Sequence, residues 1–393
     1  MTVRRVLFVT HNFPRSSGDA AGGFLLDLAH ALSTVGVTVE VIAPHAAGLT
    51  ERDVVDGVHV RRVRYGSDAD ETLAYTGTMA EQVKSSTRSK RAMLRLIGAM
   101  RRATRHRLAS GDIDVVHAHW WFPAALAIGR TAVRARVPMV VTSHGSDARM
   151  ATGATAHLAS FALGRATAVT TVSQWLAQRL TPLTAAPVTV APMPADVTRY
   201  TAQAAIRSNP ARLLFVGRLN VQKNPALLLR AMNELPDDVH LDIVGDGPDT
   251  SALHALSAQL GIAHRVAWHG QQPRDSMPAF YAQANCTLVP SRDEGFGMAA
   301  AESLLCETPV IATRSGGLPD IVRDGESGTL LDTFEDVAPW SAAIRAIIGD
   351  PIRRAELGAT GRAQMMSLVS PAAVAERYRV VYEQARRGIV RAR

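Results

Sequence analysis

The chain has 393 residues, of which 47% are hydrophobic and 20% charged. This composition excludes a disordered chain, and the length favours two or three domains over one. Cys286 and Cys306 are the only cysteines, and both lie in apolar segments, so we expect no disulfide framework and two buried thiols. No apolar run approaches the ~20 residues of a membrane-spanning helix or resembles a signal peptide. We therefore expect a cytoplasmic protein.

The first 42 residues follow a strand–glycine–helix–strand pattern. A continuous apolar run over 6–10 predicts a strand buried on both faces. Gly22 and Gly23 precede a helix with Leu25, Leu28 and Leu32 on one stripe, and an apolar strand follows at 37–42. This is the mononucleotide-binding half of a Rossmann-type domain. The glycines do not fit G-x-G-x-x-G and no acidic residue ends the second strand, so a nicotinamide site is not expected.

A polar segment and a basic helix come next. Residues 45–82 show little periodicity and are interpreted as an insertion. The following segment, 84–108, predicts a helix with Met93, Leu96 and Met100 on one side and arginines on the other. Nine of the Lys and Arg residues of this chain, which has a formal charge of +8, fall between Lys84 and Arg107. The helix is either a solvated surface of its domain or a contact for an anionic membrane or nucleic acid.

The strand–helix alternation then resumes and is repeated after a proline-rich stretch. Strands are predicted at 113–117, 139–142, 168–172 and 188–190, and again at 212–216, 239–244, 265–268, 286–290 and 309–313. Two such sets predict an α/β protein with two facing, doubly wound Rossmann-like domains. We place the first domain at 1–195, a linker at 196–210, the second domain at 211–370, and a final helix at 371–393.

The stretch 290–319 contains two junctions at which a strand runs into glycines. Gly295 and Gly297 flank Phe296 before a helix that includes Glu302, and Gly316 and Gly317 follow the next strand. Such junctions leave bare backbone N–H groups at one end of the sheet. Open parallel sheets bind ligands at that end, and a glycine-preceded helix N-terminus favours phosphate.

Two pairs of charged residues accompany these junctions. Glu294 and Glu302 are separated by seven residues, and about 1.5 Å per helical residue puts Glu302 ~9 Å beyond the helix start. Carboxylates accept hydrogen bonds from sugar or ribose hydroxyls. Arg218 and Lys223 follow the first strand of the second domain and supply about two positive charges, enough for a nucleotide diphosphate.

In this context the chain resembles the retaining glycosyltransferases of family 4, which have the two-domain GT-B fold and a Glu-x7-Glu motif. The resemblance covers nearly the whole chain in the order of the family's motifs. Its matching pieces are Gly22-Gly23, His144-Gly145-Ser146-Asp147, Gly217-Arg218, Lys223-Asn224, Gly245-Asp246-Gly247-Pro248, the block 294–313, and Gly316-Gly317-Leu318-Pro319-Asp320. The chain departs from the family pattern at Cys306-Glu307 and at Ser303-Leu304, where altered packing is expected rather than lost activity.

The resemblance implies retaining, metal-independent transfer of a sugar, as by a hexosyltransferase, from a nucleotide diphosphate sugar to an acceptor hydroxyl, with no cofactor. Arg218 and Lys223 would stabilise the diphosphate, and the departing phosphate would take the acceptor proton. Glu294 would contact the sugar, Glu302 the ribose, and His144 would line the reaction centre. The other implied donor-binding residues are glycines and backbone amides of the same loops: Gly23, Gly217, Gly245, Phe296, Gly297 and Met298.

The acceptor side is less defined. Trp120 and Trp121 are interpreted either as an acceptor wall or as core, and Asp147 follows His144 in the same loop. No metal site is expected: Asp68-Ala69-Asp70 and Asp112-Ile113-Asp114 match Asp-x-Asp only as common triplets, and His117 with His119 lacks a third ligand.

Three other functions fit parts of the pattern. A nucleotide-sugar epimerase would consume donor without an acceptor. A phosphorylase would need a pyridoxal-phosphate lysine, and Lys223 is the only lysine of the second domain. A non-catalytic binder would use 84–107 on a membrane surface or on nucleic acid. A transferase could also make peripheral membrane contact through this segment at the cytoplasmic face, and nucleic acid is not expected as its partner.

Overall fold

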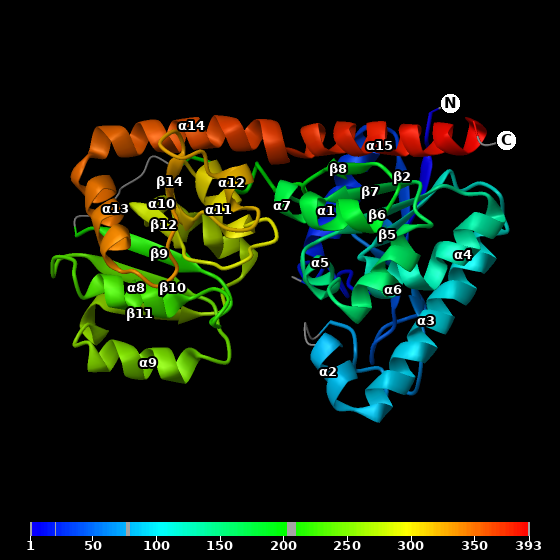
Figure 1. Ribbon diagram of the computed structural model, residues 1–393, viewed down its shortest axis with the longest axis horizontal. Helices are drawn as coiled ribbons and strands as arrows, with labels where there is room; N and C mark the ends of the chain where they lie inside the picture. The colour runs from blue at the N-terminus through cyan, green and yellow to red at the C-terminus, as the bar shows by residue number, and fades with distance from the viewer. Residues whose placement is uncertain (1, 20, 76–78, 203–209, 392–393) are drawn as a thin grey trace. The chain divides into compact units, whose positions relative to one another are not determined.

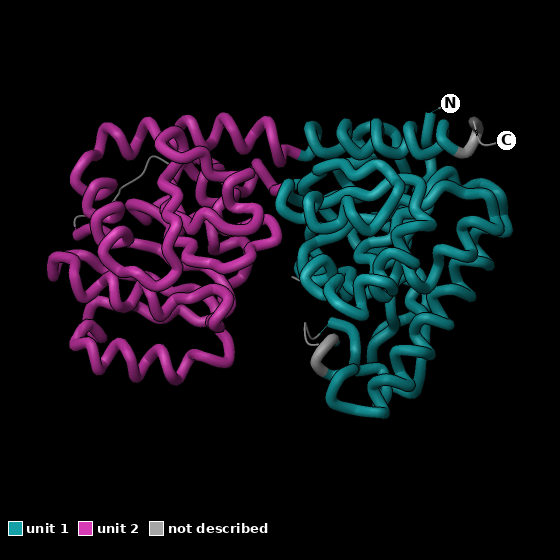
Figure 2. Tube along the Cα trace, viewed as in Figure 1, with its two compact units in different colours: residues 1–194, 371–393 teal, residues 195–370 magenta. Residues whose placement is uncertain are grey.

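The computed structural model describes residues 2–19, 21–75, 79–202 and 210–391. Two compact units make up the chain: unit 1 comprises 1–194 and 371–393, and unit 2 comprises 195–370 (Figure 2). Each unit is a parallel sheet between helices (Figure 1). The predicted fold class is confirmed.

Unit 1 is built on an eight-stranded sheet in the order β3-β4-β2-β1-β5-β6-β7-β8. Its strands are parallel except for β3, which runs antiparallel to β4. The strands are β1 (Arg5–Val9), β2 (Thr38–Pro44), β3 (Arg52–Val55), β4 (Val58–Val63), β5 (Val115–His119), β6 (Met139–Ser143), β7 (Ala168–Thr171) and β8 (Val188–Val190). The helices are α1 (Gly23–Thr34), α2 (Met79–Ser85), α3 (Thr87–Leu108), α4 (Leu126–Ala135), α5 (Ser146–Met150), α6 (Ala154–Leu163), α7 (Gln174–Leu180) and α15 (Pro371–Arg391).

Unit 2 has a six-stranded, fully parallel sheet in the order β11-β10-β9-β12-β13-β14. The strands are β9 (Arg212–Val216), β10 (His240–Val244), β11 (Val266–Gly270), β12 (Cys286–Val289), β13 (Val310–Thr313) and β14 (Gly328–Leu331). The helices are α8 (Pro225–Met232), α9 (Thr250–Gln259), α10 (Met277–Gln283), α11 (Met298–Leu305), α12 (Leu318–Ile321), α13 (Ala338–Gly349) and α14 (Pro351–Val369). A core cluster packs one face of this sheet against α8, α9 and α13, with Phe215, Leu288 and Trp340 fully buried.

The segment 45–82 is not a simple insertion, because β3 and β4 lie within it and extend the sheet. The strand β4 was missed because Arg61 and Arg62 interrupt its apolar alternation. Arg62 nevertheless points inward: its side chain is buried, and its guanidinium donates to the carbonyl oxygens of Phe13 and Pro14 at 3.5 and 2.5 Å. Its Nε–H has no partner in the described part of the chain, and the Asp53 carboxylate, 3.6 Å from the guanidinium, offsets the buried charge.

Two other predicted segments differ in detail. The basic helix is two helices, α2 and α3, separated at Ser86, whose hydroxyl accepts from the Ser89 N–H at the start of α3. The predicted linker belongs to unit 2, where Tyr200 is 1% exposed and its carbonyl accepts from Arg362 at 3.2 Å; residues 203–209 lie outside the described part. No helix in the described ranges is sufficiently long and apolar to span a membrane.

The last helix, α15, completes the core of unit 1 (Figure 1). It packs along α1 and buries Val374, Tyr378 and Tyr382 completely. The Tyr382 hydroxyl lies 2.8 Å from Nδ1 of His117, which is in the central strand β5, and the Nε2 of the same ring lies 2.6 Å from the Thr142 hydroxyl. Burial holds the pKa of His117 well below its usual value, so the ring is neutral.

We predict that Tyr382→Phe destabilises the protein by about 1–3 kcal/mol, because it leaves a buried imidazole nitrogen without its partner. Urea unfolding of the full chain measures this as a lower midpoint. Val380→Ala, a truncation at a 39%-exposed position of the same helix, is the control and should change stability by less than about 0.5 kcal/mol. Equal midpoints for both variants would show that the hydroxyl contributes nothing.

Candidate active site

The candidate donor site lies at the switch point of the unit 2 sheet. The strand β9 has β10 on one side and β12 on the other. The sheet grows from β9 toward one edge through β10 and β11, and toward the other edge through β12, β13 and β14, so the strand order reverses at β9. Ligands of doubly wound sheets bind beyond the carboxyl ends of the strands at this point. The loops 217–224 and 290–297 follow β9 and β12, and they carry the charged residues that the sequence singled out.

Lys223 and Glu294 form an ion pair between these two loops, with their Nζ and Oε2 atoms in direct contact. Their side chains are 23% and 14% exposed. The predicted diphosphate cation and the predicted sugar-binding carboxylate are therefore direct partners. Arg218 lies in the same loop as Lys223 and is exposed; within the described ranges its guanidinium makes no ion pair.

The second glycine turn fixes the backbone of Glu294. The Gly317 N–H donates to the Glu294 carbonyl at 2.8 Å, and the Asp293 N–H donates to the Ser315 hydroxyl at 3.0 Å. Gly316 has φ +61°, and a Cβ there would lie only 2.2 Å from the Glu294 carbonyl oxygen. The two glycine junctions predicted within 290–319 are thus in contact, and the second junction positions the backbone of Glu294, which precedes the first.

A second close approach occurs where β9 and β10 end. The Gly217 N–H donates to the Val244 carbonyl at 3.0 Å, and a Cβ on Gly245 would lie 2.0 Å from the Gly217 carbonyl oxygen. Gly245 has φ +135°, in the region that favours glycine. The structure thus assigns Gly217 and Gly245 to the close packing of two loops.

The helix α11 begins at Met298, directly after Gly297 at φ +105°, as expected from the glycines that precede it. Its first N–H groups, including those of Met298 and Ala299, have no intrahelical partner. Met298 is half-buried, whereas the Phe296 side chain is 7% exposed and packs in the unit. Only the backbone of Phe296 is therefore suited to a ligand contact.

Glu302 has a different environment from Glu294. One carboxylate oxygen accepts from the hydroxyl of the fully buried Tyr281 at 2.9 Å. Burial raises the pKa of Glu302, and the hydroxyls of Tyr281 and Tyr200 offset this only partly. A carboxylate has about four acceptor positions, so the contact with Tyr281 leaves acceptor capacity for the ribose contact predicted from the sequence.

In unit 1, His144 belongs to a cluster of rings beyond β1, β5 and β6. Its Nε2 lies 3.1 Å from Nδ1 of His119, and its ring is 4.4 Å from that of Trp120 and 5.1 Å from that of Phe24, between centroids. Burial lowers the pKa of His144 to about 3. The imidazole is neutral at physiological pH.

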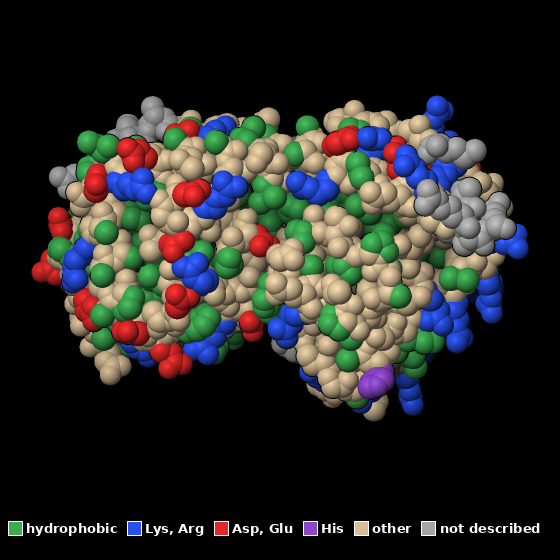
Figure 3. Space-filling model, turned by 45° about the horizontal axis from the view of Figure 1, so that its top comes forward, with side chains coloured by type: hydrophobic (Ala, Val, Ile, Leu, Met, Phe, Trp, Pro, Cys, Tyr) green, Lys and Arg blue, Asp and Glu red, His purple; other side chains and the backbone are tan. Residues whose placement is uncertain are grey.

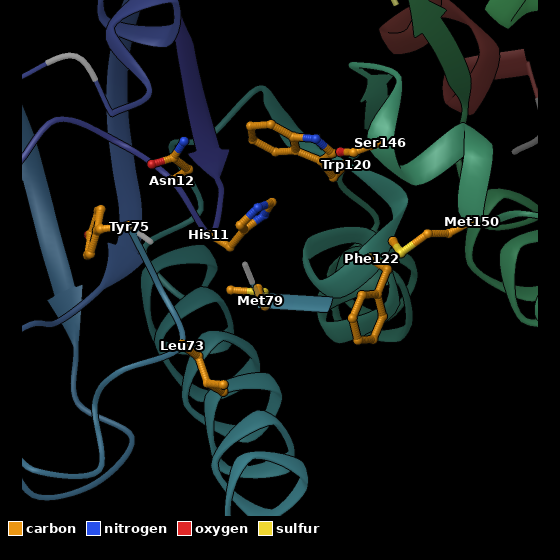
Figure 4. Close-up of a pocket in the computed structure, with 9 residues that line it drawn as sticks. All are labelled: His11, Asn12, Leu73, Tyr75, Met79, Trp120, Phe122, Ser146 and Met150. Carbon is orange, nitrogen blue, oxygen red and sulfur yellow. The ribbon is translucent and has the colours of Figure 1, made fainter. Parts of the chain in front are cut away.

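The unit 1 sheet has its own switch point between β1 and β5, and a cavity of about 240 Å³ lies beyond it (Figure 4). Its lining comes from the loops after β1, β4, β5 and β6: His11, Asn12, Leu73, Tyr75, Met79, Trp120, Phe122, Ser146 and Met150. Trp120 has φ +68°, and its ring lies 4.3 Å from that of His11. Of the two tryptophans considered for an acceptor wall, Trp120 lines this cavity.

Trp121 and Asp147 hold the loops behind the cavity. Trp121 is 2% exposed, and its indole N–H donates to the Asp147 carbonyl at 2.7 Å. The Asp147 carboxylate is fully buried and accepts from Trp121 N–H and the Ser143 hydroxyl at 3.0 and 2.8 Å, and from two further backbone N–H groups. These contacts give Asp147 a positioning role. Gly23 is buried at the start of α1.

The residues considered for a metal are engaged in other contacts. Asp70 and Asp112 form ion pairs with Arg88 and Arg107, respectively. His117 uses both ring nitrogens within the core. The one group of described His and acidic side chains close enough to share an ion is His45, Asp68 and Glu71, in which both nitrogens of His45 already have protein partners.

Several cavity residues were not predicted from the sequence: His11, Asn12, Tyr75, Phe122 and Met150. The only signal for the first two was their position directly after the first strand, where a switch-point ligand is expected. Tyr75 and Met79 come from the segment that was interpreted as an insertion, and nothing in their spacing points to a site.

Comparisons with known proteins agree with this architecture. Residues 21–199 match the family described as Glycosyltransferase Family 4, and residues 196–364 match Glycosyl transferases group 1. A D-inositol 3-phosphate glycosyltransferase from Xylanimonas cellulosilytica is 30% identical over 382 residues, covering 88% of each chain. The enzyme of that name from Mycolicibacterium gilvum is 32% identical over 367 residues, covering 85% of this chain and 79% of its own.

Solved structures share the fold. A sucrose-phosphate synthase from Thermosynechococcus elongatus has a TM-score of 0.78 at 20% identity, covering 97% of this chain and 98% of its own. Anabaena HepE in complex with UDP-glucose has a TM-score of 0.69 at 18% identity, covering 96% and 99%.

The two parallel sheets and the charged switch point of unit 2 define a glycosyltransferase of GT-B fold that uses a nucleotide sugar. The chain belongs to glycosyltransferase family 4.

We predict that Gly316→Ala weakens nucleotide-sugar binding and activity, because its Cβ would displace the Glu294 backbone. Gly325→Ala is the matched control: Gly325 has φ +74°, but its added Cβ would meet no atom within 4 Å. Both variants carry the left-handed backbone cost of roughly 1–2 kcal/mol. Unfolding should therefore show this cost in both variants, with a further loss of stability in Gly316→Ala from the overlap with Glu294. Donor titrations should show lost affinity in Gly316→Ala alone. Equal donor affinities would exclude this coupling.

Proposed function

We propose that this enzyme transfers a sugar from a nucleotide diphosphate sugar to an acceptor hydroxyl with retention of anomeric configuration and without a metal. The observation that carries the proposal is the Lys223–Glu294 pair at the switch point of unit 2. A sugar diphosphate offers hydroxyls that donate to Glu294 and phosphate oxygens that accept from Lys223, so one donor molecule satisfies both partners.

In the proposed reaction, the bond between the anomeric carbon and the diphosphate oxygen breaks as the acceptor oxygen bonds to the same carbon on the same face. Lys223 and the exposed Arg218 stabilise the negative charge that develops on the diphosphate, as preorganised cations do at phosphoryl leaving groups. The acceptor proton passes to a departing phosphate oxygen. No protein group is required as general base, which agrees with His144, whose pKa of about 3 makes its imidazole a weak base.

The names of similar proteins define the first substrates to test. HepE was solved with UDP and with UDP-glucose, and a starch synthase of the same fold with ADP, so uridine and adenine nucleotide sugars come first. The 30–32% identical relatives are named for D-inositol 3-phosphate, which is the first phosphorylated acceptor to compare.

We predict opposite effects on nucleotide binding for the two partners of the ion pair. Lys223→Ala should weaken nucleoside diphosphate binding by about 10- to 100-fold, as expected for about 1.5–3 kcal/mol of a charged hydrogen bond. Glu294→Gln removes a negative charge beside the diphosphate, so it should keep or raise that affinity while sugar transfer falls at least tenfold.

Calorimetric titration with UDP and ADP, and nucleotide release from their glucose conjugates, measure the two quantities. Arg230→Ala, at an exposed position of α8, is the control and should change neither. Full transfer by Glu294→Gln, or unchanged nucleotide binding by Lys223→Ala, would contradict the assignment. Release of an altered nucleotide sugar without any acceptor would identify an epimerase instead.

We also propose that α3 adsorbs to anionic membrane surfaces by charge alone. Its apolar stripe, with Met93, Leu96 and Met100 at most 3% exposed, is buried in unit 1 and cannot insert into a bilayer. Arg101, Arg102 and other basic side chains lie on its exposed face, and Figure 3 shows Lys and Arg gathered over this part of unit 1. Each such residue contributes about 1 kcal/mol near an anionic bilayer.

The double variant Arg101→Glu/Arg102→Glu should therefore lose at least tenfold in affinity for phosphatidylserine vesicles at low salt, measured by co-sedimentation. Arg230→Glu/Arg345→Glu makes the same charge change on unit 2 and should lose much less. Binding that persists on uncharged phosphatidylcholine vesicles, or equal losses in both variants, would refute adsorption through α3. Preferential binding of competing DNA would show that the surface serves nucleic acid.

A further inference from the structure

The cavity in unit 1 has no charged residue in its described lining (Figure 4). Aromatic and apolar side chains surround it, with Tyr75 and Leu73 on one side and Phe122 and Met150 on the other. Burial lowers the pKa of His11 to about 4, so this ring is neutral as well.

The cations behind the cavity already have partners. The Arg62 side chain is buried, and its guanidinium donates to the Tyr75 hydroxyl at 3.0 Å and to two backbone carbonyls. Arg15 lies over the Tyr75 ring at 5.5 Å, but its guanidinium is held by both carboxylate oxygens of Asp19 at 2.6 and 3.2 Å. Neither arginine is positioned to neutralise a phosphate in the cavity without breaking these contacts.

The unsatisfied polar atoms of the lining indicate what it can accept. Asn12 Oδ1 and His11 Nδ1 are buried without a hydrogen-bond partner in the described part of the chain. An amide oxygen only accepts hydrogen bonds, so it suits a hydroxyl and repels a phosphate oxygen. Burying an ionised group without a compensating charge is costly. Aromatic faces, by contrast, bury apolar surface such as the C–H face of a sugar ring or an aglycone.

From these observations we infer that the cavity binds the acceptor and selects an uncharged, hydroxyl-bearing one with an apolar face, and that it excludes phosphorylated acceptors. The inference rests on the proposed glycosyl transfer and specifies its second substrate. It separates this chain from the relatives named for D-inositol 3-phosphate. Asn12, His11 and Trp120 are the residues assigned to acceptor recognition.

The test compares matched neutral and phosphorylated ligands on the full chain saturated with nucleoside diphosphate. The pairs are myo-inositol with D-inositol 3-phosphate, and octyl glucoside with its 6-phosphate. Calorimetry of the wild-type protein should show the neutral member of each pair binding at least tenfold more tightly, and the octyl glucoside more tightly than myo-inositol.

A variant with a positive charge in the cavity tests whether the neutral lining sets this preference. Met79→Arg should shift the neutral-to-phosphorylated affinity ratio at least tenfold toward the phosphorylated member. Leu94→Arg adds the same charge at a 70%-exposed position of α3, outside the cavity, and should not shift the ratio.

Wild-type protein that binds D-inositol 3-phosphate as tightly as myo-inositol, or tighter, would overturn the inference, and so would an unchanged ratio in Met79→Arg. Loss of nucleotide binding in Lys223→Ala is measured independently of these ratios. Unchanged nucleotide binding in Lys223→Ala would count against the proposed transferase reaction and not against the acceptor inference, so the two conclusions are tested separately.

Discussion

The geometry of the candidate donor site depends on two contacts in which a glycine lies so close to another part of the backbone that a side chain would not fit. Gly316 lies against the carbonyl of Glu294, and Gly245 lies against that of Gly217, at distances where a Cβ would overlap oxygen. The first contact sets the position of the Glu294 carboxylate, and the second brings the ends of β9 and β10 together. The Lys223–Glu294 pair can then form between loops whose backbones are already fixed.

The switch points of the two sheets carry opposite chemistry. Unit 2 presents two cations and a carboxylate, partly exposed, as a nucleotide diphosphate sugar requires. The described lining of the unit 1 cavity is neutral and mainly aromatic and apolar, and burial keeps its His11 and the nearby His144 uncharged. The same topological position thus carries charged side chains in one unit and a neutral lining in the other.

Sequence periodicity was sufficient for the fold class and for most strands, because buried parallel strands are continuous apolar runs. It failed at β3, at β14 and at β4, where Arg62 points inward. Lys223 and Glu294 could be singled out as candidate donor residues because short glycine-rich loops hold them near strands that could be predicted. Their mutual contact could not be predicted, since it depends on tertiary approach through Gly316. The cavity residues Tyr75 and Met79 gave no local signal.

The last helix has a consequence for biosynthesis. Unit 1 is discontinuous, because α15 follows all of unit 2 in the chain and supplies Tyr382 to His117 in a central strand. Domains generally form in order as the chain emerges from the ribosome. In this chain, unit 1 is synthesised first but can be completed only last. The surface that α15 covers stays exposed while the 176 residues of unit 2 are synthesised. Transiently exposed apolar surface of this kind favours aggregation of a partly made chain.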